Sequence, residues 1–302
     1  MEQIAKILAT IVGESNVRLQ EPMKNHTTFR IGGAADLFIT PASVEQLIAT
    51  IGILREKEMP FLLLGNGSNL LVGDKGIRGA VIQLFPNLNK IEIQGDTIRA
   101  EGGVLLSALG MAAAENSLTG LEFAAGIPGT LGGASVMNAG AYGGEMKDVL
   151  VEVEVLTKEM QCLTLPASEL ELSYRHSIIP EQGYIVLRAT MKLAQGEQSQ
   201  IKGTMADLAE RRREKQPLQY PSAGSTFKRP TGYFAGKLVE DAGLKGKRIG
   251  GAEVSQKHAG FVVNCGGATA QDVLDLIQFC QDTVQEAFQV QLEPEVKLIG
   301  EF

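Results

Sequence analysis

Glycine is the component that most restricts what this chain can fold into. The sequence contains 35 glycines among 302 residues, about 12% where globular proteins average about 7%. They cluster beside apolar runs in three stretches, residues 65–79, 126–144 and 243–251. Because glycine has no Cβ and adopts positive φ readily, such stretches allow a backbone to approach a ligand or another backbone closely. They therefore predict close-approach loops rather than flexible linkers.

Composition excludes several broad classes of protein. Lys plus Arg number 28 and Asp plus Glu 35, which gives a formal net charge of −7. An acidic chain matches poorly with the broad basic surface that binds nucleic acid, although a small basic pocket for a phosphorylated ligand remains compatible. No stretch approaches 18 uninterrupted apolar residues, which argues against a membrane span. We therefore expect neither nucleic acid nor a membrane as a partner, and the length predicts about two domains.

Cysteine and histidine are too dispersed for a metal centre. The three cysteines form no C-x-x-C pair and the three histidines form no cluster: Cys162, Cys265 and Cys280, and His26, His176 and His258. We expect no metal site, no disulfide framework and a cytoplasmic chain with reduced thiols. The apolar positions in residues 4–12 have helical spacing, so they predict an amphipathic first helix rather than a secretory signal.

Short strands and helices alternate along the chain and predict an α+β fold in two parts. Residues 44–57 have helical spacing with Ser43 as the N-cap, and residues 91–100 predict a hairpin that turns at Gly95-Asp96. Further expected elements are strands at 61–64, at 149–155 with a partner strand after a turn near 158–159, and at 184–193, a helix ending at Lys215, a long helix at 271–288 and an alternating strand at 290–299. A change to polar composition near residue 200 predicts a domain boundary there.

The first glycine cluster begins with a loop directly after a buried strand. Residues 65–69 read Gly-Asn-Gly-Ser-Asn, and successive backbone N–H groups in such a loop form a concave site for an anion such as a diphosphate. A plain hairpin is the alternative, because Asn66-Gly67 between apolar runs is a strong turn signal. The loop is not a G-x-G-x-x-G motif, since the residue three after Gly67 is Leu70, and residues 232–238 lack P-loop spacing.

The second cluster, residues 125–143, has no hydrophobic period and consists mostly of small residues. Pro128 stiffens it, and Thr, Ser and Asn supply hydrogen-bonding groups. Such a segment suits a backbone that presses against a flat ring or a diphosphate. The alternative is a helix whose small residues pack closely on a neighbour.

Six segments together give the chain a recognisable family pattern. They are Asn25–Gly33 (NHTTFRIGG), Gly65–Asn69, Gly126–Gly143, Tyr174–Ser177 (YRHS), Ala223–Lys228 (AGSTFK) and Leu292–Val296 (LEPEV). In this order and over nearly the whole length, the sequence resembles the UDP-N-acetylenolpyruvoylglucosamine reductases, flavoenzymes that complete UDP-N-acetylmuramate in peptidoglycan synthesis. The short spacing between Tyr184 and Ala223 is similar to that of the shorter subtype, which lacks a substrate-capping loop.

The resemblance implies a fold and a set of ligands. The fold would be α+β, with a two-part FAD-binding region of vanillyl-alcohol-oxidase (PCMH) type in residues 1–200, its lobes about 1–70 and 71–200. A smaller substrate-binding domain, 201–302, would follow, with a last strand that can return to the FAD region. FAD would be the cofactor, NADPH the co-substrate and a UDP-linked enolpyruvyl amino sugar the substrate. The implied cofactor-binding residues are Gly65, Asn66, Gly67, Ser68, Asn69, Gly126, Ile127, Pro128, Gly129, Thr130, Gly133, Ser135, Asn138, Ala139 and Gly140.

Three residues carry the implied chemistry. Arg175 can grip the substrate carboxylate in two places and stabilise negative charge that grows there; otherwise it is a surface arginine. Ser225, flanked by glycine, can donate a proton to an enediolate carbon; otherwise it is a turn or cap residue. Glu295 can assist only as a hydrogen-bond donor, and the residues alone do not separate it from Glu293, although the family pattern favours Glu295.

The remaining implied roles concern substrate binding. Tyr174, Lys228, Arg229 and His258 are the candidates, and Lys215 is a weaker one. The longer subtype tends to have Asn where this chain has Arg229. The alternative functions are another FAD-dependent oxidoreductase of the same fold, acting on an alcohol or hydroxy acid, and a catalytically silent nucleotide-binding module. The sequence predicts no particular protein partner.

Overall fold

The computed structural model describes all 302 residues and contains two compact units of chain. Unit 1 comprises Met1–Arg18, Phe38–Asn66 and Val81–Arg212, and unit 2 comprises Leu19–Leu37, Gly67–Ala80 and Arg213–Phe302. Each unit is therefore discontinuous in sequence. The assignment of residues 1–200 to FAD binding, with a boundary near residue 200, stays a prediction.

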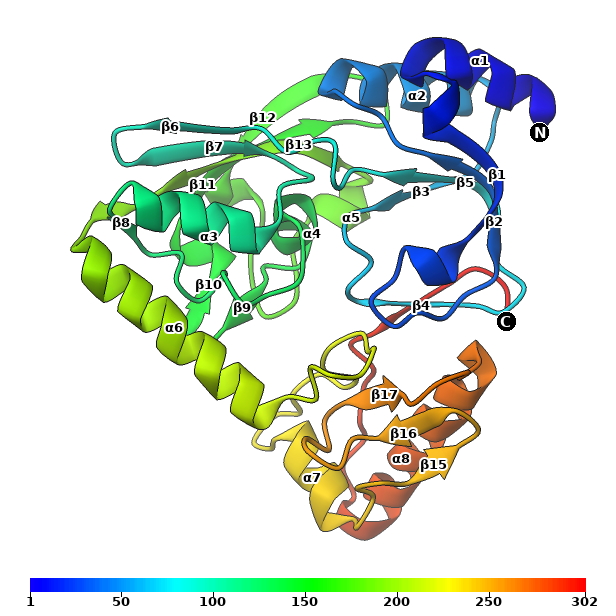
Figure 1. The fold of residues 1–302 in the computed structure, drawn as a ribbon, viewed down its shortest axis with the longest axis vertical. Helices are drawn as coiled ribbons and strands as arrows, with labels where there is room; N and C mark the ends of the chain where they lie inside the picture. Colours follow the sequence, from blue (N-terminus) through cyan, green and yellow to red (C-terminus); the bar gives the residue numbers. More distant parts are fainter. The chain divides into compact units, whose positions relative to one another are not determined.

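The main sheet of unit 1 has five strands in the order β12-β11-β13-β7-β6 (Figure 1). Every neighbouring pair is antiparallel. The strands are β6 (Ile91–Gln94), β7 (Thr97–Glu101), β11 (Leu150–Leu156), β12 (Cys162–Pro166) and β13 (Ile185–Lys192). The predicted strands are confirmed, and so is the turn at Gly95-Asp96, because Gln94 pairs with Thr97 across it.

Two helices rich in small residues pack within this part of unit 1 (Figure 1). They are α3 (Leu106–Glu115) and α4 (Leu131–Val136), and α4 contacts β13 and β7. Alanine and glycine allow close packing: a Cβ at Gly132 would lie 2.9 Å from the carbonyl oxygen of Gly102. The hydrophobic core of this part includes the buried side chains of Ile98, Leu109, Leu131 and Val153.

Unit 1 is completed by helices and short pairings around the sheet. These elements are α1 (Glu2–Val12), η1 (Glu14–Asn16), α2 (Val44–Glu56), β8 (Leu118–Thr119), β9 (Gly140–Ala141), β10 (Gly144–Glu145), η3 (Met146–Asp148), η4 (Ala167–Glu169), α5 (Ile179–Gln182), β14 (Ala194–Gln195) and α6 (Gln198–Lys215), which continues into unit 2. Helices α1 and α2 confirm their predictions, and the Ser43 hydroxyl accepts the Gln46 N–H at 3.3 Å as the predicted cap. No helix combines the length and apolar character needed to span a bilayer.

A four-stranded sheet of order β1-β2-β5-β3 contains strands whose residues belong to both units. Its strands are β1 (Val17–Pro22), β2 (Ala34–Ile39), β3 (Phe61–Leu64) and β5 (Ile77–Gln83), and the short helix η2 (Met23–Asn25) follows β1. Strand β3 is not hydrogen-bonded to β4 (Leu70–Val72), since β4 belongs to another sheet. The plain-hairpin interpretation of residues 61–72 is therefore wrong.

The C-terminal part of unit 2 is a small sheet with two helices (Figure 1). Strands β15 (Arg248–Ile249), β16 (Ala252–Val254) and β17 (Val262–Asn264) form an antiparallel sheet that α8 (Ala270–Phe288) contacts, and α7 (Ala235–Asp241) packs on α8. The predicted long helix is confirmed, and Thr269 and Asp272 cap it reciprocally. Burial raises the pKa of Cys280 on the inner face of α8 to about 12. This thiol therefore stays protonated and packs in the core as an unreactive side chain.

The predicted strand at 290–299 is mostly wrong. Only β18 (Lys297–Ile299) is a strand, and it pairs in parallel with β4. The residues before it make a single bridge, Phe227 with Pro294, in which proline occupies a position whose N–H is not needed, since the bonds run from Lys228 to Glu293 and from Glu295 to Thr226. Leu292 and Val296 are buried, whereas Leu298 is 48% exposed, so the apolar alternation does not mark one continuous buried face.

Candidate functional site

In unit 1 the two glycine-rich stretches lie against each other. The side-chain amide of Asn66 donates to the carbonyl oxygen of Pro128 at 2.6 Å. A Cβ at Gly65 would lie only 2.3 Å from Thr130 Oγ1. Backbone at Gly126, Pro128 and Gly133 is exposed beside this contact. Segments about sixty residues apart in sequence thus form one backbone-lined surface, and glycine is required where they touch.

The second stretch combines both interpretations made from its composition. Residues 131–136 form the short helix α4, as the close-packed helix alternative requires, and loops lie on each side of it. The hydroxyl of Ser135 is buried and donates to the carbonyl of Leu131 at 2.9 Å, so this side chain supports the helix. Gly133 is exposed, and a Cβ there would meet only Thr130 Oγ1, at 3.7 Å.

Arg212 is a contact of this surface that the sequence analysis missed. Its guanidinium donates to the carbonyl oxygen of Gly126, and burial lowers the pKa of Arg212. The basic run at residues 211–213 is predicted simply as the cationic end of a helix. That prediction holds for α6, but nothing in the local sequence indicates which of three adjacent arginines turns back to the glycine-rich loop.

Arg175 stands at the tip of a tight turn in unit 1. Ser173 and His176 exchange backbone hydrogen bonds of 3.2 Å in both directions, and Arg175 has a φ of +56°. Its guanidinium carbon lies 5.0 Å from the ring centre of Tyr174, so the two candidate ligand contacts at this tip touch each other. The turn is fastened to the end of α4, because the Ser177 hydroxyl donates to the carbonyl of Val136.

In unit 2 the second half of the loop, residues 67–69, is held by the motif at residues 25–33. Gly67 has a φ of +61°, and a Cβ there would lie 2.1 Å from the carbonyl oxygen of His26. Thr28 donates its N–H to the carbonyl of Gly67 at 3.2 Å and its hydroxyl to the carbonyl of Ser222 at 2.7 Å. Thr28 thereby links the loop to the segment that leads to Ser225.

The candidate proton donor and the candidate acid lie on paired segments of unit 2. Phe227 bridges Pro294 in antiparallel fashion, and the N–H of Glu295 donates to the carbonyl of Thr226 at 2.8 Å. Ser225 is exposed between buried Ala223 and buried Thr226. Residues seventy positions apart are thus neighbours across one pairing. The structure therefore pairs Glu295 with Thr226, the residue that follows Ser225.

Asn69 of the loop hydrogen-bonds to the segment that contains Glu295. Its side-chain amide donates to the carbonyl of Glu295 at 3.2 Å, and its own carbonyl accepts the Lys297 N–H at 3.0 Å. Its side chain therefore has a structural partner. Ser68 between Gly67 and Asn69 is half-buried.

The other substrate candidates of unit 2 flank these segments. Lys228 forms an ion pair with Glu293 at 2.5 Å. The side chains of Glu293 and Glu295 therefore differ in their contacts, since this ion pair belongs to Glu293. Arg229 is exposed, with its guanidinium carbon 3.9 Å from the centre of the Phe234 ring. Lys215 lies in the last turn of α6 and is exposed.

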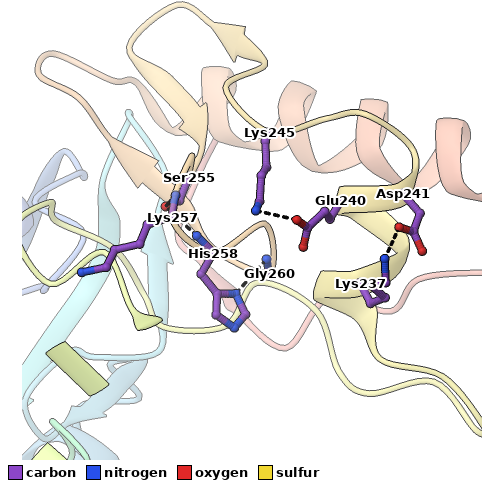
Figure 2. A network of polar contacts seen from close by, with 8 residues as sticks. All are labelled: Lys237, Glu240, Asp241, Lys245, Ser255, Lys257, His258 and Gly260. Atoms are coloured by element: carbon purple, nitrogen blue, oxygen red, sulfur yellow. Dashed lines mark hydrogen bonds and ion pairs between the residues drawn. The ribbon is translucent and has the colours of Figure 1, made fainter. Parts of the chain in front are cut away.

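His258 belongs to a polar network beside α7 (Figure 2). Its Nδ1 accepts the N–H of Gly260 at 3.1 Å and its ring packs edge-on to Phe261. Ser255 accepts the N–H groups of Lys257 and His258. In the same view Lys245 pairs with Glu240 at 2.6 Å and Lys237 pairs with Asp241. These contacts give His258 a structural role in its loop, and a substrate contact stays a prediction.

The stability of the protein should fall below pH 6.5 in part because of His258. Desolvation lowers the pKa of His258 below its ordinary 6.5, so the unfolded chain takes up this proton before the folded one. His258 is neutral in both states above pH 6.5 and costs stability only as the pH falls through the window below it. Replacing His258 with Asn retains an acceptor for Gly260 and should make the loss of urea midpoint between pH 7 and 5 shallower, at fixed FAD. Equal slopes for the two proteins would contradict this.

Comparisons with known proteins agree with this organisation. Residues 35–165 match the model of the FAD binding domain, and residues 216–299 match that of the UDP-N-acetylenolpyruvoylglucosamine reductase C-terminal domain. The proteins named UDP-N-acetylenolpyruvoylglucosamine reductase from Caldanaerobacter subterraneus subsp. tengcongensis and Alkaliphilus oremlandii are 55% and 53% identical to this chain. The alignments cover 97% and 98% of this chain and 97% of each relative.

Solved structures extend the comparison to the fold. UDP-N-acetylenolpyruvylglucosamine reductase from Thermus caldophilus matches with a TM-score of 0.80 and 38% identity, over 94% of this chain and 98% of that one. Alkyldihydroxyacetonephosphate synthase shares only the fold, at a TM-score of 0.51 and 18% identity over 65% of this chain. The expected α+β fold with an FAD-binding region of PCMH type is confirmed.

These findings define the class first: the chain is an FAD-dependent oxidoreductase. Within that class, it belongs to the UDP-N-acetylenolpyruvoylglucosamine reductase family.

Proposed function

We propose that this chain reduces UDP-N-acetylenolpyruvoylglucosamine to UDP-N-acetylmuramate, with FAD as cofactor and NADPH as the reductant, in the synthesis of peptidoglycan precursors. Identity above 50% over nearly the full length of relatives that carry this name supports the proposal most strongly. The intact candidates Arg175, Ser225 and Glu295 favour it over an alcohol or hydroxy-acid oxidase on the same fold and over a silent nucleotide-binding module. A cytoplasmic location, which three free cysteines favour, belongs to the same proposal.

The surface of unit 1 fits an FAD. The main chain at Gly133 is exposed in the first turn of α4 with no side chain of its own, and the contact between Gly65 and Thr130 leaves no room for a Cβ. When bound, FAD accepts reducing equivalents from NADPH and delivers them to the methylene carbon of the enolpyruvyl ether. We propose that residues 65–66 and 126–130 of this unit hold it, and cofactor contacts of residues 67–69 stay a prediction.

The reaction asks two things of the protein's own side chains. Reduction at the methylene carbon drives negative charge onto the substrate carboxylate, and we assign the planar, permanently charged guanidinium of Arg175 to hold and stabilise that group. The other alkene carbon then needs a proton, and we assign the hydroxyl of Ser225 to supply it. Glu295 is its neighbour across the pairing of residues 226 and 295, which favours Glu295 over Glu293 as the assisting acid.

Substrate binding is proposed for Tyr174, Lys228 and Arg229. Tyr174 is 50% exposed beside Arg175, and Lys228 and Arg229 directly follow the segment that carries Ser225. A cationic lysine and arginine suit a diphosphate.

The visible spectrum of the purified protein tests this proposal directly. We expect a yellow protein whose flavin absorbance bleaches with NADPH under anaerobic conditions and returns when the enolpyruvyl sugar nucleotide is added. A simple alcohol or hydroxy acid serves as the control and should not restore the oxidised spectrum. A colourless protein that binds no added FAD would overturn the proposal, and restoration by the control substrate would favour the alternative oxidoreductase.

A further inference from the structure

Asn138 lies near the end of the second glycine-rich stretch, and its side chain hydrogen-bonds to segments of unit 1 outside α4. It is 1% exposed, with a φ of +43° that asparagine tolerates better than most residues. Its Oδ1 accepts the N–H of Lys147 at 2.9 Å. Its Nδ2 donates to Glu145 Oε2 at 2.7 Å and to the carbonyl of Ser173 at 3.1 Å. An amide offers two donors and an acceptor, so these three bonds engage both ends of the side chain.

The carbonyl of Ser173 is the point where this side chain meets the turn of Arg175. The same carbonyl accepts the N–H of His176, which closes the turn. Asn138 therefore holds the turn at Ser173, and the bond from Ser177 to the carbonyl of Val136 holds the residue that follows the turn. Both bonds reach the C-terminal end of α4, at its last residue Val136 and at Asn138 two residues later.

Glu145, the other acceptor of the Asn138 amide, places a negative charge beside the turn of Arg175. The hydrogen bond from Lys147 lowers the pKa of Glu145, and the hydrogen bond from Asn138 and the charge of Arg175 act in the same direction against partial burial. Glu145 is thus a carboxylate at neutral pH, and it can accept but not donate. The carboxylate and the carbonyl of Ser173 are both acceptors, and the two N–H groups of the Asn138 amide join them.

We propose that Asn138 is a positioning residue for Arg175: its amide holds the Ser173–His176 turn against Glu145, and so fixes where the guanidinium meets a substrate carboxylate. The inference rests on the role of Arg175 in the proposed function. It gives the Asn138 side chain a task distinct from cofactor binding. Misplacing a charged group by about 1 Å can cost about 100-fold in rate, so a side chain remote from the reacting atoms can matter to the reaction.

Two variants separate this role from general stability. Asn138→Asp keeps the shape and the acceptor but loses both donors. Asn138→Gly removes the side chain and still accepts the positive φ. Asn87→Asp is the matched control, since Asn87 also donates its amide to a backbone carbonyl, that of Thr40, elsewhere in unit 1. Arg175→Gln is the reference for a lost guanidinium.

The decisive measurement is ligand binding to the FAD-loaded protein by calorimetry. UDP-N-acetylmuramate carries the carboxylate, and UDP-N-acetylglucosamine does not. We expect both Asn138 variants to lose about tenfold or more in affinity for the first ligand and none for the second, with FAD content and bleaching by NADPH unchanged. Asn87→Asp should bind both ligands as the natural protein does.

The other outcomes are equally informative. Loss of FAD from both Asn138 variants would make the residue a cofactor contact and overturn the inference. Unchanged binding in both variants, while Arg175→Gln loses affinity for UDP-N-acetylmuramate alone, would also overturn it and leave the proposed function intact. If Arg175→Gln binds both ligands like the natural protein, the role assigned to Arg175 under the proposed function fails instead.

Discussion

Replacing Ser225 with alanine should leave reduction of the flavin by NADPH nearly unchanged and slow its reoxidation by the enolpyruvyl substrate by about 10²–10⁴-fold. The hydroxyl supplies a proton only after the substrate has been reduced, so its loss affects one half-reaction. The side chain is exposed, and removing one oxygen from it creates no cavity in the core. Anaerobic stopped-flow absorbance follows each half-reaction separately.

Ser222→Ala is the control for the Ser225 experiment. Ser222 precedes Ser225 by three residues, and its carbonyl, which the substitution retains, accepts the hydroxyl of Thr28. Both half-reactions should therefore proceed at the natural rate in this variant. If Ser225→Ala also shows two unchanged half-reactions, the proton comes from another group and the assignment is wrong.

Replacing Gly65 with alanine should sharply reduce retention of FAD. The new Cβ would lie 2.3 Å from Thr130 Oγ1, 3.2 Å from its Cγ2 and 3.3 Å from its Cβ, so the two glycine-rich stretches must move apart. Overpacking of this kind costs about 1–3 kcal/mol, and here the cost falls on the surface proposed to hold the cofactor. The FAD content of the purified protein and the dissociation constant for FAD measure the effect.

A second substitution shows whether contact with Thr130 is the cause. Thr130→Ala removes Oγ1 and Cγ2, and its hydroxyl makes no cap hydrogen bond to α4. Because Thr130 belongs to the segment proposed to hold FAD, the FAD affinity of Thr130→Ala alone is the reference for the double variant. We expect Gly65→Ala with Thr130→Ala to regain much of the lost FAD affinity, which is a coupling of about 0.5–3 kcal/mol between adjacent residues. Gly203→Ala, where a Cβ meets nothing within 4 Å, is the neutral control. A double variant no better than Gly65→Ala would rule out this steric explanation.

Local patterns predicted the elements whose causes are local. The helix α2 begins where Ser43 caps it, and the hairpin of β6 and β7 turns at Gly95-Asp96. The long helix α8 follows its apolar period. In each case a few neighbouring residues decide the backbone conformation, so the sequence contains the whole signal.

The rest depends on pairings that local patterns do not encode. Apolar alternation predicted a strand at 290–299, but the backbone groups of Glu293 and Glu295 bond to Lys228 and Thr226, and only residues 297–299 join a strand. Likewise nothing local to either segment predicts that Glu295 pairs with Thr226, beside Ser225. The bond from Arg212 to Gly126 and the three bonds of Asn138 have no sequence signal at all.

The pairing of β18 with β4 has a consequence for how the protein is made. Strand β4 directly follows the Gly65–Asn69 loop, and its neighbours Gly73 and Lys75 donate to the carbonyls of Ile299 and Glu301. These partners lie more than two hundred residues further along the chain, so they leave the ribosome later than β4. Strand β4 therefore has no partner strand while more than two hundred further residues are synthesised. A chain that ends before β18 cannot form this pair of strands.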